Sequence, residues 1–247
     1  MLTVVAPAEL LTPDQELELS KRLAQWRRQP LSPAELAELL PKVSDPALAL
    51  AIGERLGMAG PQAFELIGPL CQQLGLQSAL IRALSICHHP DAKQQLLQWL
   101  PQAGEFEPEV LRALGCWGNG IDLSIITNAL NAPSQQHRLA GIELLTFRCR
   151  RISTEQLLSL CEPLLNDLRT EVVIATLRLL QRRDEPEILQ RIAACATVDA
   201  LPGVAEMAIQ ALGCIQSESS RQLLAQLTQD LQQPRLKESL QRQLKAQ

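Results

Sequence analysis

The chain has 247 residues and a formal net charge of −4, which argues against a general polyanion-binding protein. Aromatic residues make up only 2 % of the chain and tyrosine is absent, so leucine, alanine and isoleucine must form the core. The chain is rich in these residues and in glutamine, glutamate and arginine, most of which favour helices, and β-branched runs are nearly absent. We therefore predict an all-α protein.

The cysteines and the N-terminus indicate where the chain resides. Seven cysteines are scattered along it without a Cys-x-x-Cys pair, which is typical of thiols kept reduced in the cytoplasm. The N-terminus has no basic region followed by a long apolar run, so we expect no signal peptide. No apolar stretch approaches the ~18 residues that a membrane span requires. We predict a cytoplasmic protein without a membrane span.

Two helix starts lie close together near the N-terminus. Thr12 is expected to cap a helix that begins at Pro13, carries acidic residues in its first turn and runs to about Gln29. The segment Ser32-Pro33-Ala34-Glu35 repeats this pattern as a capping box. We assign residues 1–30 to an N-terminal capping helix.

The most informative pattern is a phrase that recurs six times, with successive copies between 28 and 35 residues apart. A fixed period of this size is typical of a solenoid, in which one pair of helices repeats and stacks. We expect residues 31–217 to form the repeats, and residues 218–247 to form one polar C-terminal capping helix. The leucines that anchor the phrase are Leu56, Leu84, Leu114, Leu144, Leu177 and Leu212. The predicted units are about 31–60, 61–90, 91–121, 122–152, 153–185 and 186–217.

Two copies of the phrase resemble a known repeat family. Arg112-Ala-Leu-Gly-Cys-Trp-Gly-Asn-Gly-Ile-Asp122 and Gln210-Ala-Leu-Gly-Cys-Ile215 resemble the second helix and turn of HEAT-like repeats. This resemblance implies a right-handed α-solenoid of about six repeats over residues 31–217. The short repeats also resemble those of cyanobacterial phycobilin lyase subunits and related adaptors. Members of that group bind bilins and phycobiliprotein subunits, or act as adaptors in pigment turnover and cofactor assembly.

One register position of the repeat carries charge. The residue two before the anchoring leucine is Glu54, Arg82 or Arg112 in the first three units. Because equivalent positions of stacked repeats lie side by side, these residues should form a ladder on a face that commonly binds partners. The ladder either contacts an acidic partner or is a surface feature in which Glu54 offsets Arg82. In the later units the same register position is occupied by the uncharged residues Ile142, Ala175 and Gln210. Any charged groove of this kind is therefore confined to the N-terminal half.

Four other features are candidate sites. Trp99, on a first helix, is expected to be a partly exposed interface anchor. Cys149 stands among arginines in 147–151, which could activate its thiol or could simply form a basic turn. Cys116 could carry a cluster or a persulfide. Cys87-His88-His89 lacks the further ligands that zinc requires, so no metal is predicted.

No catalytic motif is present, so we predict a non-catalytic scaffold or adaptor. It would bind a protein partner through Glu54, Arg82, Arg112 and Trp99, with no nucleic acid and no cofactor. The family resemblance implies an alternative: a bilin-handling subunit, or a lyase that attaches or removes a bilin such as phycocyanobilin. Arg82 and Arg112 would then hold the propionates. A third reading is a scaffold for iron–sulfur or other cofactor assembly that uses Cys149 or Cys116.

Overall fold

The computed structural model describes residues 9–197, 201 and 203–246. These residues form α-helices and short 3-10 segments and contain no strand, which confirms the predicted all-α class. None of the described helices is both long enough and apolar enough to cross a membrane. The chain divides into two compact units, residues 1–117 and 118–247, and each is described by itself below.

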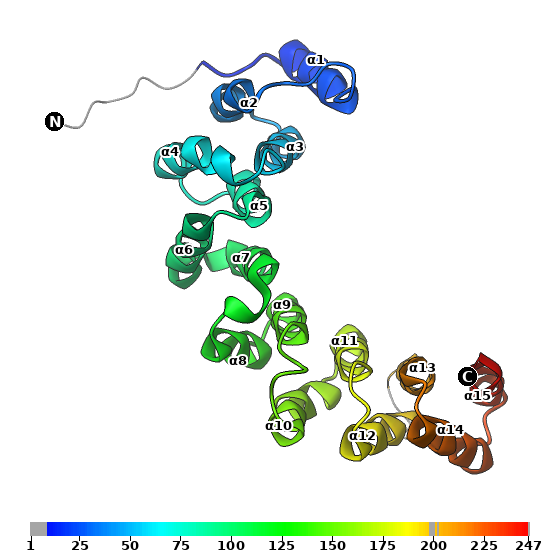
Figure 1. Cartoon of the computed structure of the whole chain (residues 1–247). Coiled ribbons are helices and arrows are strands. Elements are labelled where there is room, and N and C mark those ends of the chain that lie inside the picture. Colours follow the sequence, from blue (N-terminus) through cyan, green and yellow to red (C-terminus); the bar gives the residue numbers. More distant parts are fainter. Residues whose placement is uncertain (1–8, 198–200, 202, 247) are drawn as a thin grey trace. The chain divides into compact units, whose positions relative to one another are not determined.

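The first unit contains two rows of helices (Figure 1). One row is formed by α1, α3, α5 and α7, each of which contacts the next. The other row is formed in the same way by α2, α4 and α6. The helices are α1 (Pro13–Ala24), α2 (Pro33–Leu39), α3 (Pro46–Gly57), α4 (Phe64–Leu74), α5 (Ser78–Cys87), α6 (Pro90–Trp99) and α7 (Glu107–Leu114).

The two predicted helix starts are confirmed. The Thr12 hydroxyl accepts a hydrogen bond from the backbone N–H of Gln15, and the Gln15 side chain accepts one from the N–H of Thr12. Ser32 and Glu35 make the same reciprocal pair at the start of α2. Both helices carry proline at their first position, where no N–H is needed.

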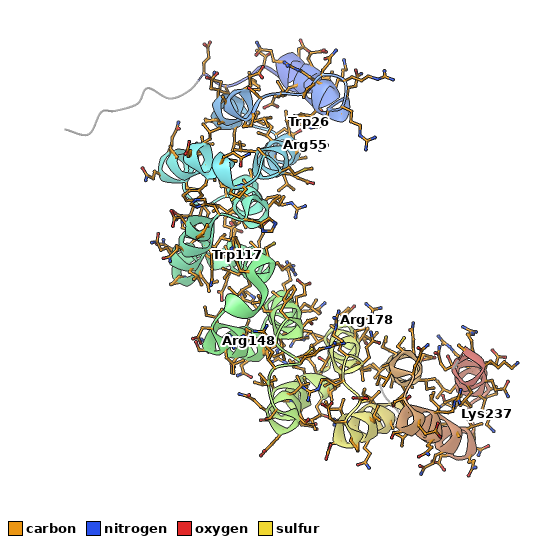
Figure 2. All side chains as sticks on the ribbon, in the orientation of Figure 1. Trp26, Arg55, Trp117, Arg148, Arg178 and Lys237 are labelled. Atoms are coloured by element: carbon orange, nitrogen blue, oxygen red, sulfur yellow. The ribbon has the colours of Figure 1, made fainter. Side chains whose placement is uncertain are left out.

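The helix α1 ends earlier than predicted, at Ala24 rather than near Gln29. A turn follows, and it carries the Trp26 ring to α3, where the guanidinium carbon of Arg55 lies 5.2 Å from the ring centroid (Figure 2). This cation–π contact holds the turn against α3, whereas a continued α1 would follow a different path. Residues 1–8 of the segment assigned to the N-terminal cap lie outside the described residues.

The helices α3 and α5 approach each other most closely at two glycines of α3. A Cβ atom on Gly53 would overlap the carbonyl oxygen of Ala79, and one on Gly57 would lie 2.6 Å from that of Ala83. Gly53 and Gly57 are four residues apart in α3, and Ala79 and Ala83 are four residues apart in α5. The small residues of the two helices therefore meet along one line. The two backbones can therefore come closer than larger side chains would permit.

The second unit repeats the two-row arrangement (Figure 1). One row is formed by α9, α11, α13 and α15, and the other by α8, α10, α12 and α14, with successive members of each row in contact. The helices are α8 (Leu123–Asn131), α9 (Gln135–Thr146), α10 (Thr154–Leu165), α11 (Thr170–Leu180), α12 (Pro186–Thr197), α13 (Val204–Ile215), α14 (Glu218–Asp230) and α15 (Pro234–Ala246).

The single C-terminal capping helix expected over residues 218–247 is wrong. The structure has two helices there, because α14 stops at Asp230 and Leu231 adopts an extended conformation with φ −85° and ψ 128°. Pro234 explains the break: its ring disfavours helical geometry in the preceding residue, and it suits the first position of a new helix. The segment is a helix pair that extends both rows of the second unit.

The anchoring leucines form the centre of the core. All six lie in α3, α5, α7, α9, α11 or α13, which are the second helices of the predicted pairs, and each has 0 % of its surface exposed. Deleting such a side chain typically costs about 2–5 kcal/mol. The sequence phrase therefore marks a fully buried position of each second helix.

An aspartate between two arginines joins two turns of the second unit. Asp167 follows α10, and its carboxylate accepts hydrogen bonds from the guanidiniums of Arg138 and Arg169. The same guanidiniums donate to the carbonyls of Ala132 and Pro133 in the turn between α8 and α9. The hydrogen bonds from Arg169 are the main cause that lowers the pKa of Asp167 to about 2.

Replacing Gly53 by alanine tests the close approach of α3 and α5. Alanine is the better helix former by about 1 kcal/mol, so local propensity predicts stabilisation. We expect Gly53→Ala to destabilise the protein by about 1–3 kcal/mol, because the added methyl group forces the two backbones apart. Urea unfolding followed by circular dichroism measures the sign. A variant as stable as the parent would contradict the packing described.

The Asp167 cluster predicts a pH-dependent contribution to stability. The pKa of Asp167 is about 2 in the folded protein, against an ordinary value of 3.8, so the ionised form is favoured by folding. The contribution, about 2 kcal/mol, is complete above the ordinary pKa and is lost as the pH falls through about 2. We expect Asp167→Asn to lower the free energy of unfolding at pH 7.

The pH profile of this difference is the test. The gap between the parent and Asp167→Asn should shrink as the pH falls from 3.8 to about 2 in urea titrations. Asp230→Asn is the control, since Asp230 is an exposed residue at the end of α14. A gap that is the same at neutral and acidic pH would show that the ion pairs contribute nothing specific.

Candidate functional site

The predicted charged ladder borders a groove in the first unit. The groove runs across α3, α5 and α7 and has a volume of about 360 Å³. Each of these three helices contributes the residue two before its anchoring leucine, so Glu54, Arg82 and Arg112 meet at one surface. We call this surface the first-unit groove; its lining residues are Leu50, Glu54, Ile81, Arg82, Ser85, Glu109, Arg112, Ala113 and Cys116.

Apolar side chains from all three helices line part of the first-unit groove. Ile81 and Ala113 are almost fully covered by their neighbours, whereas Leu50 keeps 39 % of its surface exposed. Leu50 is a large apolar residue open to solvent beside a groove, which is the arrangement of an anchor point for another apolar group. Ser85 adds no free donor, since its hydroxyl donates to the carbonyl of Arg82.

The charges along the groove are balanced. Arg82 lies 3.6 Å from the carboxylate of Glu54, and both side chains are about half exposed. At the α7 side, Glu109 accepts a hydrogen bond of 2.8 Å from the hydroxyl of Ser78. The lining contains two glutamates and two arginines, so it has no net charge. The offset of Arg82 by Glu54 that the sequence suggested is therefore present, and the contact of this ladder with a partner stays a prediction.

Cys116 is the thiol of the groove. It follows α7 and is exposed, in contrast to most cysteines of the chain. Partial burial raises the pKa of Cys116, while the nearby charge of Arg82 acts in the opposite direction. The thiol is therefore accessible but is mainly protonated at neutral pH, which is unlike an activated nucleophile.

The other predicted thiol, Cys149, is buried, which makes it unsuitable as a reactive cysteine. Only 2 % of its surface is exposed, and its backbone carbonyl accepts a hydrogen bond from Arg183. The turn that follows α9 directs Arg150 and Arg151 to solvent and the thiol to the interior. Cys149 also lies close enough to Cys161 to contribute, after burial, to the raised pKa of that thiol.

Trp99 is not the exposed interface anchor that was expected. It is the last residue of α6, and only 6 % of its surface is exposed. The reason is its register: it lies three residues after the fully buried Leu96, so it shares the inward face of the helix. Trp99 is a core residue of the first unit and takes no part in the groove.

The segment Cys87-His88-His89 has structural roles. Cys87 is buried at the end of α5, and His88 adopts a left-handed conformation with φ 55° that ends the helix. His89 stacks on Phe64, with ring centroids 4.6 Å apart, and accepts a hydrogen bond from the N–H of Asp91 at the start of α6. Among the described residues, no three His, Cys, Asp or Glu side chains are grouped as metal ligands.

Sequence reasoning missed a second hollow, which lies within the second unit and has a volume of about 560 Å³. The sequence signal for it is a pair of basic segments, 148–151 and 182–183, of which the first was interpreted either as an activated thiol at Cys149 or as a basic turn. We call this surface the second-unit hollow; its lining residues are Arg150, Gln181, Arg182, Arg183, Asp184, Glu185, Cys214 and Ile215.

Comparison with known proteins finds no matching family model, no matching curated protein and no matching solved structure.

Thiol accessibility gives a direct test of these placements. Cys116 and Cys214 are exposed, whereas the other five cysteines are buried. Burial is the first cause that raises the pKa of both Cys71 and Cys161 to about 12. We expect two of the seven thiols to react rapidly with Ellman's reagent in the native protein, and all seven in guanidinium chloride. Mass mapping that found Cys149 among the rapidly labelled residues would overturn the assignment.

Proposed function

We propose that the chain is a right-handed α-solenoid of HEAT-like repeats that acts as a non-catalytic adaptor. The support for the solenoid is the regular order of contacts within each unit, where every helix touches the next member of its own row. The recurrence of one fully buried leucine in each second helix supports it too. Stacking of this kind exposes long surfaces formed by several repeats, which suits binding rather than chemistry.

The proposed repeats are the helix pairs themselves. The pairs from α2–α3 to α12–α13 correspond to the six units of the sequence, and α14–α15 is proposed as a seventh pair in place of a single cap. The helix α1 has no partner before it among the described residues and contacts α3, so it is proposed as the N-terminal cap of its row.

The observation that carries the proposed function is the first-unit groove. It places equivalent positions of three consecutive pairs beside apolar surface and an exposed Leu50. An amphipathic segment of a protein partner fits this chemistry: its apolar side chains would cover Leu50 and Ala113, and its charged groups would pair with the charges along the groove. Because the lining charge is balanced, binding would depend mainly on apolar contact and only weakly on salt.

Affinity capture from the source cell extract, followed by mass spectrometry, tests this proposal. We expect Leu50→Asp to capture at least ten-fold less of a partner than the parent protein does. We expect the same of the double variant Arg82→Glu/Arg112→Glu. A ten-fold loss corresponds to about 1.4 kcal/mol of binding free energy. The control is Arg27→Glu/Arg28→Glu, which makes the same change of charge at exposed residues outside the groove.

Photocrosslinking locates the contact independently of partner identity. A photoreactive p-benzoylphenylalanine in place of Leu50 should crosslink the captured protein, whereas the same group in place of Arg28 should not. Loss of the partner from the control variant, or equal crosslinking from both positions, would contradict the groove assignment. Circular dichroism and thermal unfolding of every variant establish that the loss is not due to unfolding.

The absorption spectrum of the same eluate separates the alternatives. The first-unit groove contains the two arginines and the carboxylates that a bilin would require, but its lining contains no aromatic side chain to stack on a tetrapyrrole. A visible chromophore, or a phycobiliprotein subunit as the captured partner, would favour bilin handling. An iron–sulfur cargo lost on Cys116→Ser would favour cofactor assembly. A colourless partner that depends on Leu50 supports the adaptor.

A further inference from the structure

The second-unit hollow lies where three second helices end. Arg150 belongs to the turn after α9, the residues from Gln181 to Glu185 connect α11 to α12, and Cys214 and Ile215 are the last two residues of α13. The hollow is thus formed by consecutive members of one row and lies entirely within the second unit. It is independent of the first-unit groove.

One arginine fixes the wall of the hollow and is not available to a ligand. Nε of Arg183 donates to both carboxylate oxygens of Glu185, at 2.8 and 2.9 Å. Its Nη atoms donate to the backbone carbonyls of Cys149 and Ile152 and to the hydroxyl of Thr154. The bonds from the Nη atoms join the turn after α9 to the turn after α11. The hydrogen bond from Arg183 is the main cause that lowers the pKa of Glu185. The hollow is therefore held in shape by a saturated guanidinium.

Two other arginines of the hollow have no such partners. Arg150 and Arg182 are exposed, and within the described part of the chain neither guanidinium makes a hydrogen bond or an ion pair. They come from different helix pairs and border the same hollow. The lining contains three arginines but only two acidic residues, Asp184 and Glu185, and Glu185 is bonded to Arg183. The lining therefore carries a net positive charge, in a protein whose formal net charge is −4.

Helix dipoles alone do not account for this arrangement. Cations are favoured near the C-terminal ends of helices, and Arg182 lies two residues after α11. Arg150 lies four residues after α9, beyond the last turn over which the dipole acts. The end of α13 contributes Cys214 and Ile215 and no cation. The hollow thus combines two separated guanidiniums with a thiol and an apolar side chain.

We infer that the second-unit hollow binds an acidic peptide segment of a protein partner. Guanidiniums bind carboxylates through paired hydrogen bonds, so Arg150 and Arg182 each receive one acidic side chain. Ile215 receives an apolar side chain that lies between or beside the acids. A bare anion would leave Ile215 unused, and a nucleic acid would need many more phosphate contacts than two arginines provide.

Fluorescence polarisation with a synthetic peptide tests this inference on the full chain. The probe is fluorescein-labelled Gly-Glu-Glu-Leu-Glu-Glu-Gly at low ionic strength, with the matched Gln-for-Glu peptide as the uncharged comparison. We expect binding of the acidic peptide, and at least a ten-fold loss in Arg150→Glu/Arg182→Glu. The control is Arg221→Glu/Arg242→Glu, which makes the same charge change at exposed positions of α14 and α15.

Equal loss in both double variants would show a non-specific charge effect, and no loss in Arg150→Glu/Arg182→Glu would remove the hollow from the binding surface; either outcome overturns the inference. The apolar contact is tested with a peptide that has glycine in place of leucine. This glycine peptide should bind the parent protein more weakly than the leucine peptide does. The two peptides should bind the Ile215→Ser variant equally. If leucine makes no difference, the hollow is a bare-anion site and the peptide proposal fails.

Cys214 reports occupancy without altering the arginines. In a Cys116→Ser background it is the one thiol that the structure exposes, so its maleimide labelling rate reads the hollow alone. The acidic peptide should slow this labelling, and the Gln peptide should not. In the parent protein, labelling of Cys116 in the first-unit groove should be unaffected. This measurement needs no arginine variant, so it still tests the inference if such a variant fails to fold. Its result does not depend on the adaptor function proposed for the first-unit groove.

Discussion

The burial of one leucine in each second helix is the constraint on which the rest of the structure depends. Six leucines at intervals of about one repeat have no exposed surface, and each lies near the end of its helix. A residue in that place must be enclosed by its own pair and by its neighbours. The two-row arrangement of each unit satisfies this requirement, and it brings equivalent positions of consecutive helices next to one another. Both candidate surfaces are consequences of this proximity.

Several charged side chains of the second unit join turns or helices that are distant in the sequence. Asp167 ties the α8–α9 turn to the α10–α11 turn, and Arg183 ties the turn after α9 to the turn after α11. Arg191 of α12 makes a two-pronged ion pair with Glu162 of α10, with donor–acceptor distances of 2.8 and 2.9 Å. Arg150 and Arg182 differ from these arginines, because their guanidiniums have no such partner and both border one hollow.

The two surfaces differ in chemistry and therefore in the partners that suit them. The first-unit groove is apolar along part of its lining and electrically balanced, because Glu54 is paired with Arg82. The second-unit hollow is polar and carries guanidiniums without internal partners. The proposed adaptor would use these two unlike surfaces for two segments of a partner, and binding of one segment would raise the effective concentration of the other. The sequence left open whether Arg82 and Arg112 contact an acidic partner or belong to a surface ladder, and in the structure Glu54 lies against Arg82.

The sequence by itself determined the helical class, the period of the pairs, the buried leucines, the two capped helix starts and the gathering of Glu54, Arg82 and Arg112. The helical class and the capped starts depend on composition and on capping chemistry that acts over a few residues, whereas the other features follow from a phrase that recurs every 28–35 residues. The tertiary structure alone decided that Trp99 and Cys149 are buried, because burial depends on which face of a helix or turn meets its neighbours. It also decided which arginines are paired and which are not, since Arg183 and Arg182 are adjacent in sequence yet only Arg183 meets acceptors from another turn. Such long-range pairings leave no signal in a single sequence.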